Sequence, residues 1–183
     1  MASDTRTRLL NAATEEFNEK GFAGTDTNQI ARQAGFAPQT FYRWFDDKTQ
    51  IFIAAYRGWE DIEREALEEL LRRDASAEQL VEVVVSHHSR YKIFRRSLRQ
   101  LSLENPQVRE ARAASRRRQV EAIQVWQQKL GQVQAESSIA VALLQMERLA
   151  DALAERELED MNLSPVLGRQ TLAALIESLL ART

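Results

Sequence analysis

Apolar residues recur every three or four positions along almost the whole chain, and no stretch alternates apolar and polar residues as a half-buried strand would. In residues 5–20, for example, Leu9, Ala13 and Phe17 fall on one helical face and charged side chains fall on the other. The 183 residues include only six glycines and three prolines, which provide too few turns for a sandwich or barrel of short strands. The sequence therefore predicts an all-α protein.

Capping signals mark a short helix that follows residues 5–20. Asp26 and Gln29 have the spacing of a capping box, in which each residue satisfies a backbone amide of the other. The helix that they begin is expected to end at Ala34, because Gly35 can adopt the positive φ of a tight turn at little cost.

A second short helix is predicted directly after that turn. Pro38 favours a helix start, since the first helical position needs no backbone N–H donor, and the helix should continue to about Phe45. Asp47 then provides a cap for a fourth helix that begins at Lys48.

Two short helices joined by a turn with one glycine are typical of a helix-turn-helix unit, which binds DNA in many proteins. Five positions are expected to face the small core between the crossing helices: Ile30, Ala34, Phe36, Phe41 and Trp44. The alternative interpretation is a helical hairpin with a purely structural role in a larger bundle.

The outward face of residues 38–45 carries side chains that suit base recognition. Gln39 and Arg43 can form paired hydrogen bonds with adenine and guanine edges, and Thr40 offers a hydroxyl and a methyl group. We therefore expect these three residues to contact bases in the major groove.

Other polar residues nearby suit the DNA backbone. Tyr42 and Lys48 are expected to contact phosphates, which fix the position of a protein on DNA without reading its sequence. The first amides of the helix capped by Asp26, at Thr27 and Asn28, are expected to bind a phosphate as well, with the Thr27 hydroxyl as a further donor.

The spacing of these residues resembles the DNA-binding domain of the TetR family of bacterial transcriptional regulators. The resemblance covers about the first quarter of the chain and depends on these residues: Gly21, Phe22, Gly24, Thr25, Ile30, Ala31, Ala34, Gly35, Phe36, Thr40, Phe41, Tyr42, Phe45, Asp47, Lys48 and Ile51. It implies an N-terminal three-helix DNA-binding domain at residues 1–47, with the recognition helix at 38–45. It also implies a C-terminal helical bundle at residues 48–183 that binds an effector and forms a dimer.

The predicted bundle contains residues that could line an effector pocket. Such pockets are mostly apolar with a few polar groups, and aromatic or flexible side chains on inward helix faces fit that description. The candidates are Trp59, His87, Tyr91, Trp126 and Met146. The effector itself is expected to be a small molecule of unknown identity, and the more ordinary interpretation of these side chains is a packed core.

Residues 139–146 are apolar on nearly every side, so that helix must be covered on every side. Its own domain can cover one face, and a second protomer is the simplest cover for the other. We therefore expect a homodimer formed through the last two helices across a two-fold axis.

Charge and composition limit the other functions. The net charge is −2 overall, but residues 90–118 carry a net charge of +8 (10 basic, 2 acidic), which we interpret as solvated and ion-paired helix faces rather than a second nucleic-acid surface. The absence of cysteine excludes disulfides and Cys-ligated zinc. Neighbouring His87 and His88 diverge too far on a helix to bind one metal ion. No catalytic arrangement stands out, so we expect no enzyme activity, no metal and no cofactor.

The combined hypothesis is a homodimeric transcriptional repressor that binds a palindromic double-stranded DNA operator and responds to an effector. No signal peptide or long apolar segment is present, so a soluble protein in the cytoplasm without a membrane partner is expected. The competing classes are a helical adaptor that binds only protein, which leaves Gln39, Thr40 and Arg43 without a role, and a helical-bundle enzyme, which needs convergent ionisable residues.

Overall fold

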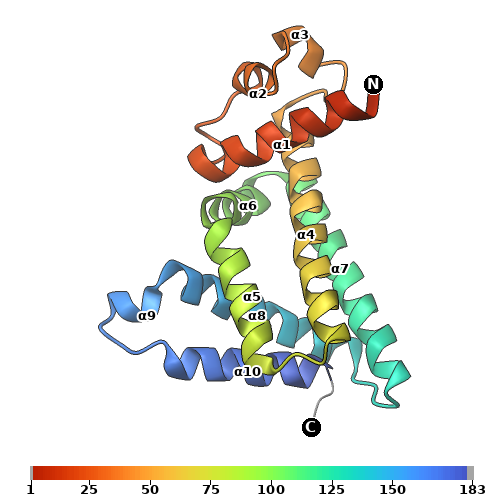
Figure 1. Ribbon diagram of the computed structural model, residues 1–183, viewed down its shortest axis with the longest axis vertical. Helices are drawn as coiled ribbons and strands as arrows, with labels where there is room; N and C mark the ends of the chain where they lie inside the picture. The colour runs from red at the N-terminus through yellow and green to blue at the C-terminus, as the bar shows by residue number, and fades with distance from the viewer. Residues whose placement is uncertain (1, 181–183) are drawn as a thin grey trace. The chain divides into compact units, whose positions relative to one another are not determined.

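The computed structural model describes residues 2–180, and this part of the chain contains ten α-helices and no strand, which confirms the all-α prediction (Figure 1). The helices are α1 (Ala2–Lys20), α2 (Thr27–Gln33), α3 (Pro38–Phe41), α4 (Lys48–Arg72), α5 (Ala77–Arg90), α6 (Lys92–Glu104), α7 (Pro106–Lys129), α8 (Glu136–Glu155), α9 (Glu157–Asp160) and α10 (Val166–Leu180). Among the described residues, every helix is too short or too polar to span a lipid bilayer.

The chain divides into two compact packing units. The first contains the residues up to Ile62 together with Ile93–Arg112, and the second contains Glu63–Lys92 and the residues from Ala113 onward. The boundary therefore lies within α4, and α6 returns to the first unit. A boundary between residues 47 and 48 describes a division of function, which stays a prediction, but the packing divides the chain elsewhere.

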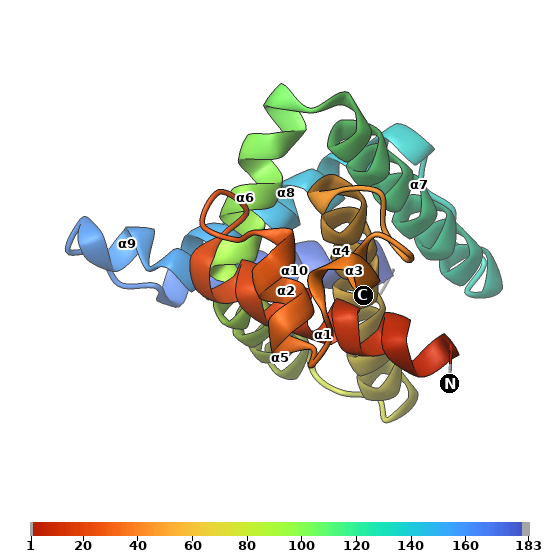
Figure 2. The same cartoon turned by 90° about the horizontal axis from the view of Figure 1, so that it is seen from above.

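Aromatic rings form the core of the first unit. The ring centroids of Phe17 in α1 and Phe52 in α4 lie 5.0 Å apart in an edge-to-face arrangement, and Phe94 of α6 stacks on Phe52 at 4.5 Å. Such pairs stabilise a core by more than the area that they bury. The helix α2 packs against both α1 and α3 (Figure 2). Because α1, α4 and α6 share this aromatic core, they form a rigid base for the two short helices.

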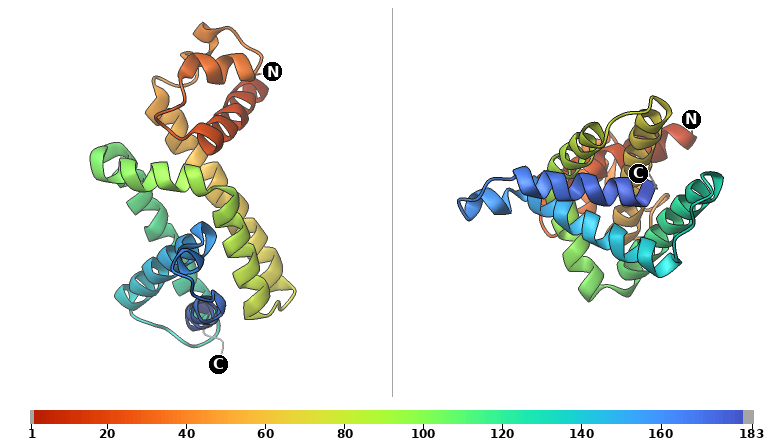
Figure 3. Two further views of the ribbon diagram at one scale, coloured as in Figure 1. Left: turned by 90° about the vertical axis from the view of Figure 1, so that its left-hand side faces the viewer. Right: turned by 90° about the horizontal axis from the view of Figure 1, so that it is seen from below.

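The second unit is built on three helices that pack against one another, α5, α8 and α10 (Figure 3). Their shared core consists of aliphatic residues, namely Leu80, Val81, Val84, Val85, Ala150, Leu153, Leu172 and Ile176. A second cluster joins α7, α8 and α10 through Val120, Ile139, Leu143 and Leu179. A capping box begins α5, because Ser76 and Gln79 each accept a hydrogen bond from the other's backbone amide.

The connection between α8 and α10 is a tight hairpin that contains the short helix α9. Arg156 ends α8 in the left-handed conformation, with φ of 64°. Gly168, in the first turn of α10, is buried where the two arms of the hairpin meet. A Cβ atom at this position would lie 3.0 Å from Leu158 Cδ1 and 3.1 Å from Leu153 Cδ2, so only glycine allows this approach without displacing those side chains.

We expect Gly168→Ala to destabilise the protein by about 1 kcal/mol, because the added methyl group overpacks a site closed by the buried Leu153. Gly58→Ala is the matched control, since a Cβ atom at that exposed position within α4 would meet nothing within 4 Å. It should stabilise the protein by about 0.5–1 kcal/mol through helix propensity alone. Chemical denaturation compares the two, and equal effects would show that Gly168 has no packing role.

Candidate nucleic-acid interface

The start of α2 is fixed by the predicted capping box. The Gln29 backbone amide donates to Asp26 Oδ1 at 2.8 Å, and the Asp26 amide donates to Gln29 Oε1 at 3.4 Å. The other end of α2 is tied to α1, because Gln33 Nε2 donates to Glu15 Oε2 at 2.8 Å. These bonds hold a helix of only seven residues, which would be unstable alone.

The turn between α2 and α3 is held by an arginine from α1. Gly35 adopts a φ of +79°, as the sequence predicted for the turn, and the Arg8 guanidinium donates a hydrogen bond of 2.7 Å to the Ala34 carbonyl. The same guanidinium lies 4.6 Å from the centroid of the Phe36 ring. Arg8 therefore satisfies a backbone acceptor at the turn and covers an aromatic ring with the same group.

The regular part of α3 is shorter than the predicted helix at 38–45. It covers Pro38–Phe41, and the next residues continue in turns in which the Arg43 amide bonds to Thr40 O and the Trp44 amide bonds to Phe41 O. These are bonds between residues three apart, as in the tighter 3₁₀ geometry that often ends a helix. The helical direction is thus kept to Trp44 although α3 itself ends at Phe41.

The predicted small core is correct at three of its five positions. Ile30, Ala34 and Phe41 are buried, whereas Phe36 and Trp44 are only half-buried. Phe45, which was expected only as the end of the helix, takes the remaining core position and is 4% exposed. The shift has a simple cause, since the tighter turns after Phe41 rotate the last residues of the segment relative to a regular α-helix.

The predicted recognition residues lie on the outside of this unit. Gln39 and Arg43 are exposed, and Thr40 is half-buried beside them. Tyr42 is 57% exposed, and its hydroxyl lies 3.0 Å from Thr27 Oγ1, a hydrogen bond that joins the end of α3 to the start of α2.

Asn28, next to Thr27 in the first turn of α2, is also exposed. The helix-turn-helix therefore presents amide, guanidinium and hydroxyl groups to solvent, over a buried apolar interior.

Lys48 has a structural role in addition to the predicted phosphate contact, which stays a prediction. Its ammonium group donates to the carbonyl oxygens of Phe22 at 2.7 Å and Thr25 at 2.8 Å, and it lies 4.2 Å from the centroid of the Phe22 ring. Partial burial lowers the pKa of Lys48 from its ordinary value, against the opposing attraction of Asp26. Two of its three donors thus fasten α4 to the loop between α1 and α2, which leaves one donor for the predicted phosphate contact.

The five residues proposed for an effector pocket are dispersed. Trp59 belongs to the first unit, where it is buried and the Arg95 Cζ atom lies 5.0 Å from the centroid of its ring. His87 and Tyr91 are buried neighbours in the second unit, with ring centroids 4.9 Å apart.

Trp126 and Met146 complete this set within the second unit. The Trp126 indole N–H donates to the Leu180 carbonyl at 3.1 Å and so closes the end of α10. Met146 packs against both aliphatic clusters of the second unit. A ligand role for these five residues stays a prediction, and the contacts show that each already packs within its own unit.

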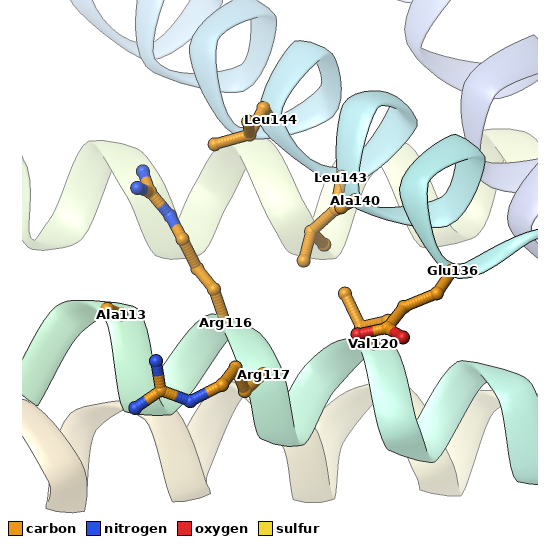
Figure 4. A pocket seen from close by; sticks show the side chains of 8 residues that line it. All are labelled: Ala113, Arg116, Arg117, Val120, Glu136, Ala140, Leu143 and Leu144. Atoms are coloured by element: carbon orange, nitrogen blue, oxygen red, sulfur yellow. The ribbon is translucent and has the colours of Figure 1, made fainter.

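A groove of about 280 Å³ lies between α7 and α8 in the second unit, and none of those five residues lines it. Figure 4 shows Arg116 and Val120 of α7 facing Ala140, Leu143 and Leu144 of α8. Arg116 is held by Glu147 of α8, with Nη2 to Oε2 at 2.6 Å. This groove was not expected, because its walls are small and aliphatic residues of the kind found at ordinary core positions and its charged residues, Arg116, Arg117 and Glu136, belong to polar helix faces.

A cluster of a buried histidine and two carboxyl groups was also missed. His88 is 4% exposed, with Nδ1 2.9 Å from Asp151 Oδ1 and Nε2 3.6 Å from Glu63 Oε1. The sequence did contain an indication of this cluster, because Asp151 lies among the apolar residues of α8 and a buried carboxylate requires a partner. Within residues 2–180, no group of three or more His, Cys, Asp or Glu side chains is arranged to hold a metal ion.

Comparison with known sequences finds relatives for the segment that contains the helix-turn-helix. Residues 9–55 match the sequence profile described as bacterial regulatory proteins, tetR family. The chain is 31% identical over 81 residues to the fatty acid metabolism regulator protein of Bacillus subtilis strain 168, an alignment that covers 44% of this chain and 42% of that protein. The chain spans less than half the length of the curated relatives that it matches.

Comparison with solved structures extends to the whole fold. A TetR-family transcriptional regulator from Rhodococcus sp. aligns with a TM-score of 0.73 and 22% identity, covering 97% of this chain and 99% of that one. A transcriptional regulator from Saccharomonospora viridis in complex with choline aligns with a TM-score of 0.68 and 21% identity, covering 96% of each chain. The arrangement of helices is therefore that of TetR-family regulators.

Replacing Lys48 with methionine separates its structural role from DNA contact. The substitution keeps the aliphatic stem but removes the ammonium donors to two carbonyl oxygens, so we predict a loss of about 2 kcal/mol in the free energy of unfolding. Arg43→Ala, at an exposed position, should change that free energy by less than about 0.5 kcal/mol. Urea denaturation of both variants provides the measurement, and unchanged stability of Lys48→Met would contradict the structural role.

Proposed function

We propose that the protein is a homodimeric transcriptional repressor that binds operator DNA and responds to a small molecule. The match of residues 9–55 to the sequence profile of the tetR family supports this proposal. The observation that carries the proposal is the exposed polar face of the helix-turn-helix. Gln39 and Arg43 stand free of the core, beside the hydroxyl pair of Thr27 and Tyr42. A helical hairpin with a structural role only would have no use for this combination.

Base recognition is assigned to the α3 segment. Arg43 and Gln39 are exposed and can each form two hydrogen bonds with a base edge in the major groove. Thr40 lies between them on the same segment and offers its hydroxyl and methyl groups. The segment is rigid because Arg8 fixes the preceding turn and Phe41 anchors it in the core, so these side chains can be presented in one orientation.

Phosphate contacts are assigned to groups at the junction of α2 and α3. The hydroxyls of Thr27 and Tyr42 lie 3.0 Å apart, close enough for both to bond to one phosphate. Asn28 is exposed beside them, and Lys48 at the start of α4 has one donor left after its two hydrogen bonds to the loop between α1 and α2. Contacts of this kind position the protein on any DNA sequence.

Dimer formation is assigned to the outer faces of α8 and α10. Val141 and Leu144 of α8 are 55% and 40% exposed, and Leu167 of α10 is 72% exposed. Ala174 on the same face of α10 is exposed and small, which permits close approach of another helix. Two copies joined there would place their recognition segments on successive major grooves of a palindromic site, about 34–36 Å apart.

Effector response is assigned to the second unit. A regulator of the same fold from Saccharomonospora viridis has been solved with choline, which supports small-molecule binding by this fold. The effector of this protein must bind the DNA-competent and DNA-incompetent states with different affinity, because equal affinity would leave their populations unchanged. We place this regulator in the cytoplasm with its DNA and assign it no enzymatic reaction.

The DNA-binding assignment predicts two different mutant phenotypes. Arg43→Ala should reduce the preference for operator over unrelated DNA by roughly 5- to 150-fold, because a base contact contributes about 1–3 kcal/mol to discrimination. Tyr42→Phe should weaken binding to all sequences alike by roughly two- to tenfold, because it removes one phosphate hydrogen bond. The exposed Arg57 of α4 provides the control variant, Arg57→Ala, which should bind like the wild type.

Fluorescence anisotropy with DNA selected from genomic fragments measures both effects, with salt held constant since phosphate binding depends on it. Unchanged operator preference in Arg43→Ala would show that another face reads the bases. A protein that selects no DNA at all would favour the alternative of a protein-binding adaptor.

The dimer assignment predicts that Val141→Asp produces a monomer, because it buries a carboxylate in an apolar contact between subunits. Val125→Asp is the control, at a position on α7 that is 51% exposed and outside the proposed interface. Sedimentation velocity at micromolar concentration should show a dimer for the wild type and the control but a monomer for Val141→Asp. A wild-type monomer, or a dimeric Val141→Asp variant, would refute the assigned interface.

A further inference from the structure

The hairpin tip, which we define as residues 156–167, exposes an apolar cluster. Met161 is 59% exposed, Leu163 55%, Val166 57% and Leu167 72%, all within seven residues. A cluster of this kind at the end of a projection is unusual in a protein that functions alone, and it is typical of a surface that another molecule covers.

The tip is an ordered element with a fixed shape. The Leu163 amide donates to Leu158 O at 2.9 Å, and the Asn162 amide donates to Glu159 O at 2.9 Å. Leu158 packs against the aliphatic core of the second unit, and Gly168 closes the base of the hairpin. The exposed side chains are therefore presented outward by a folded hairpin.

The tip is also acidic. Glu157, Glu159 and Asp160 lie on or beside α9, and Arg156 is the only basic residue of the tip. Arg156 Nε and Glu159 Oε1 form an ion pair at 3.5 Å. The exposed Glu157 and Asp160 are therefore the outward negative charges. A partner for the tip should therefore be apolar with a basic margin.

The groove between α7 and α8 has those properties. Val120, Ala140, Leu143 and Leu144 provide apolar walls, Arg116 and Arg117 line the α7 side, and Glu136 lines the α8 side near the start of that helix. Arg117 lines the groove and is exposed, as is its neighbour Arg118, so positive charge borders the opening. Figure 4 shows the Arg117 side chain at this margin, opposite the α8 wall.

Two-fold symmetry determines how tip and groove can meet. The groove lies along the N-terminal half of α8, and the tip follows its C-terminal end. In one chain these features are separated by most of a helix of 20 residues, about 30 Å long. An antiparallel pairing of α8 with its copy, about an axis near its middle, places the C-terminal end of one helix beside the N-terminal half of the other.

We infer that the hairpin tip of one protomer docks into the α7–α8 groove of its partner, with Met161 and Leu163 on the apolar walls and Glu157 and Asp160 facing Arg117 and Arg118. The inference builds on the proposed α8–α10 dimer and adds two symmetric contacts to it. A second copy suits this groove because the exposed apolar side chains and negative charges of the tip match the apolar walls and the arginine side of the groove.

Disulfide trapping tests the contact directly, since the chain has no cysteine of its own. The full-length double variant Ala140→Cys/Leu163→Cys places one thiol in the groove and one on the tip. A disulfide needs the two Cα atoms within about 7 Å, whereas residue 140 lies about 22 Å from the end of its own α8. A bridge can therefore form only between protomers.

Mild oxidation should shift the double variant to twice the chain mass on a non-reducing gel. The two single-cysteine variants should stay monomeric on the gel, as should the matched control Val125→Cys/Leu163→Cys, whose α7 thiol lies outside the groove. Equal cross-linking in the control pair, or none in the test pair, would overturn the docking.

A charge exchange provides an independent readout in solution. Arg117→Glu should weaken dimerisation by roughly two- to fivefold, as expected for exposed ion pairs, and adding Asp160→Arg to the same chain should restore the wild-type affinity. An unrestored double variant would contradict the assigned pairing of charges.

Sedimentation of the same samples separates this inference from the proposed function. A wild-type monomer would refute the dimer itself. If the wild type is a dimer but the double-cysteine variant forms no disulfide, and if the thiol of the single variant Ala140→Cys is alkylated as fast in the dimer as in dilute monomer, the dimer is retained and the docking is refuted. Protection of that thiol by an added small molecule instead of by dimerisation would assign the groove to a ligand.

Discussion

The bond from the Arg8 guanidinium to the Ala34 carbonyl fixes the geometry of the turn between α2 and α3, on which the proposed DNA recognition depends. The turn at Gly35 sets the crossing of α2 and α3, and a helix of seven residues followed by one of four cannot hold such a turn unaided. Arg8 supplies the missing support from α1, which is itself anchored in the aromatic core around Phe17. The exposed position of Arg43 is thus a consequence of packing that begins in the first helix.

Local patterns in the sequence predicted the helices and the exposed face because those features depend on neighbours along the chain. The capping box at Asp26 is an example, since it joins residues three apart. The contacts of Lys48 and the pairing of His88 with Asp151 were beyond such reasoning, since they join residues 23 or more positions apart. The return of Phe94 to the first unit was hidden for the same reason, because helical periodicity shows that a residue is buried but not which helix covers it.

The second unit shows how one helix can serve several purposes. The inner face of α8 packs on α5 and α10, one side faces α7 across the groove, and the outer face carries Val141. A sequence that is apolar on nearly every side is the expected result. We propose that the outer face binds a second copy and that the acidic tip beyond α8 extends that contact. Changes in the groove could then alter the dimer, and through it the spacing of the two recognition segments.

The central claim is that two copies of the helix-turn-helix bind successive major grooves of one DNA site. Hydroxyl-radical footprinting of a selected genomic fragment tests it most directly, because the reagent reports protection of each sugar along the backbone. If two copies bind in this way, the footprint should show two protected stretches related by a two-fold axis, with centres about 10 base pairs apart or a multiple of that distance. An unprotected fragment, or one asymmetric stretch covering a lone half-site, would contradict it.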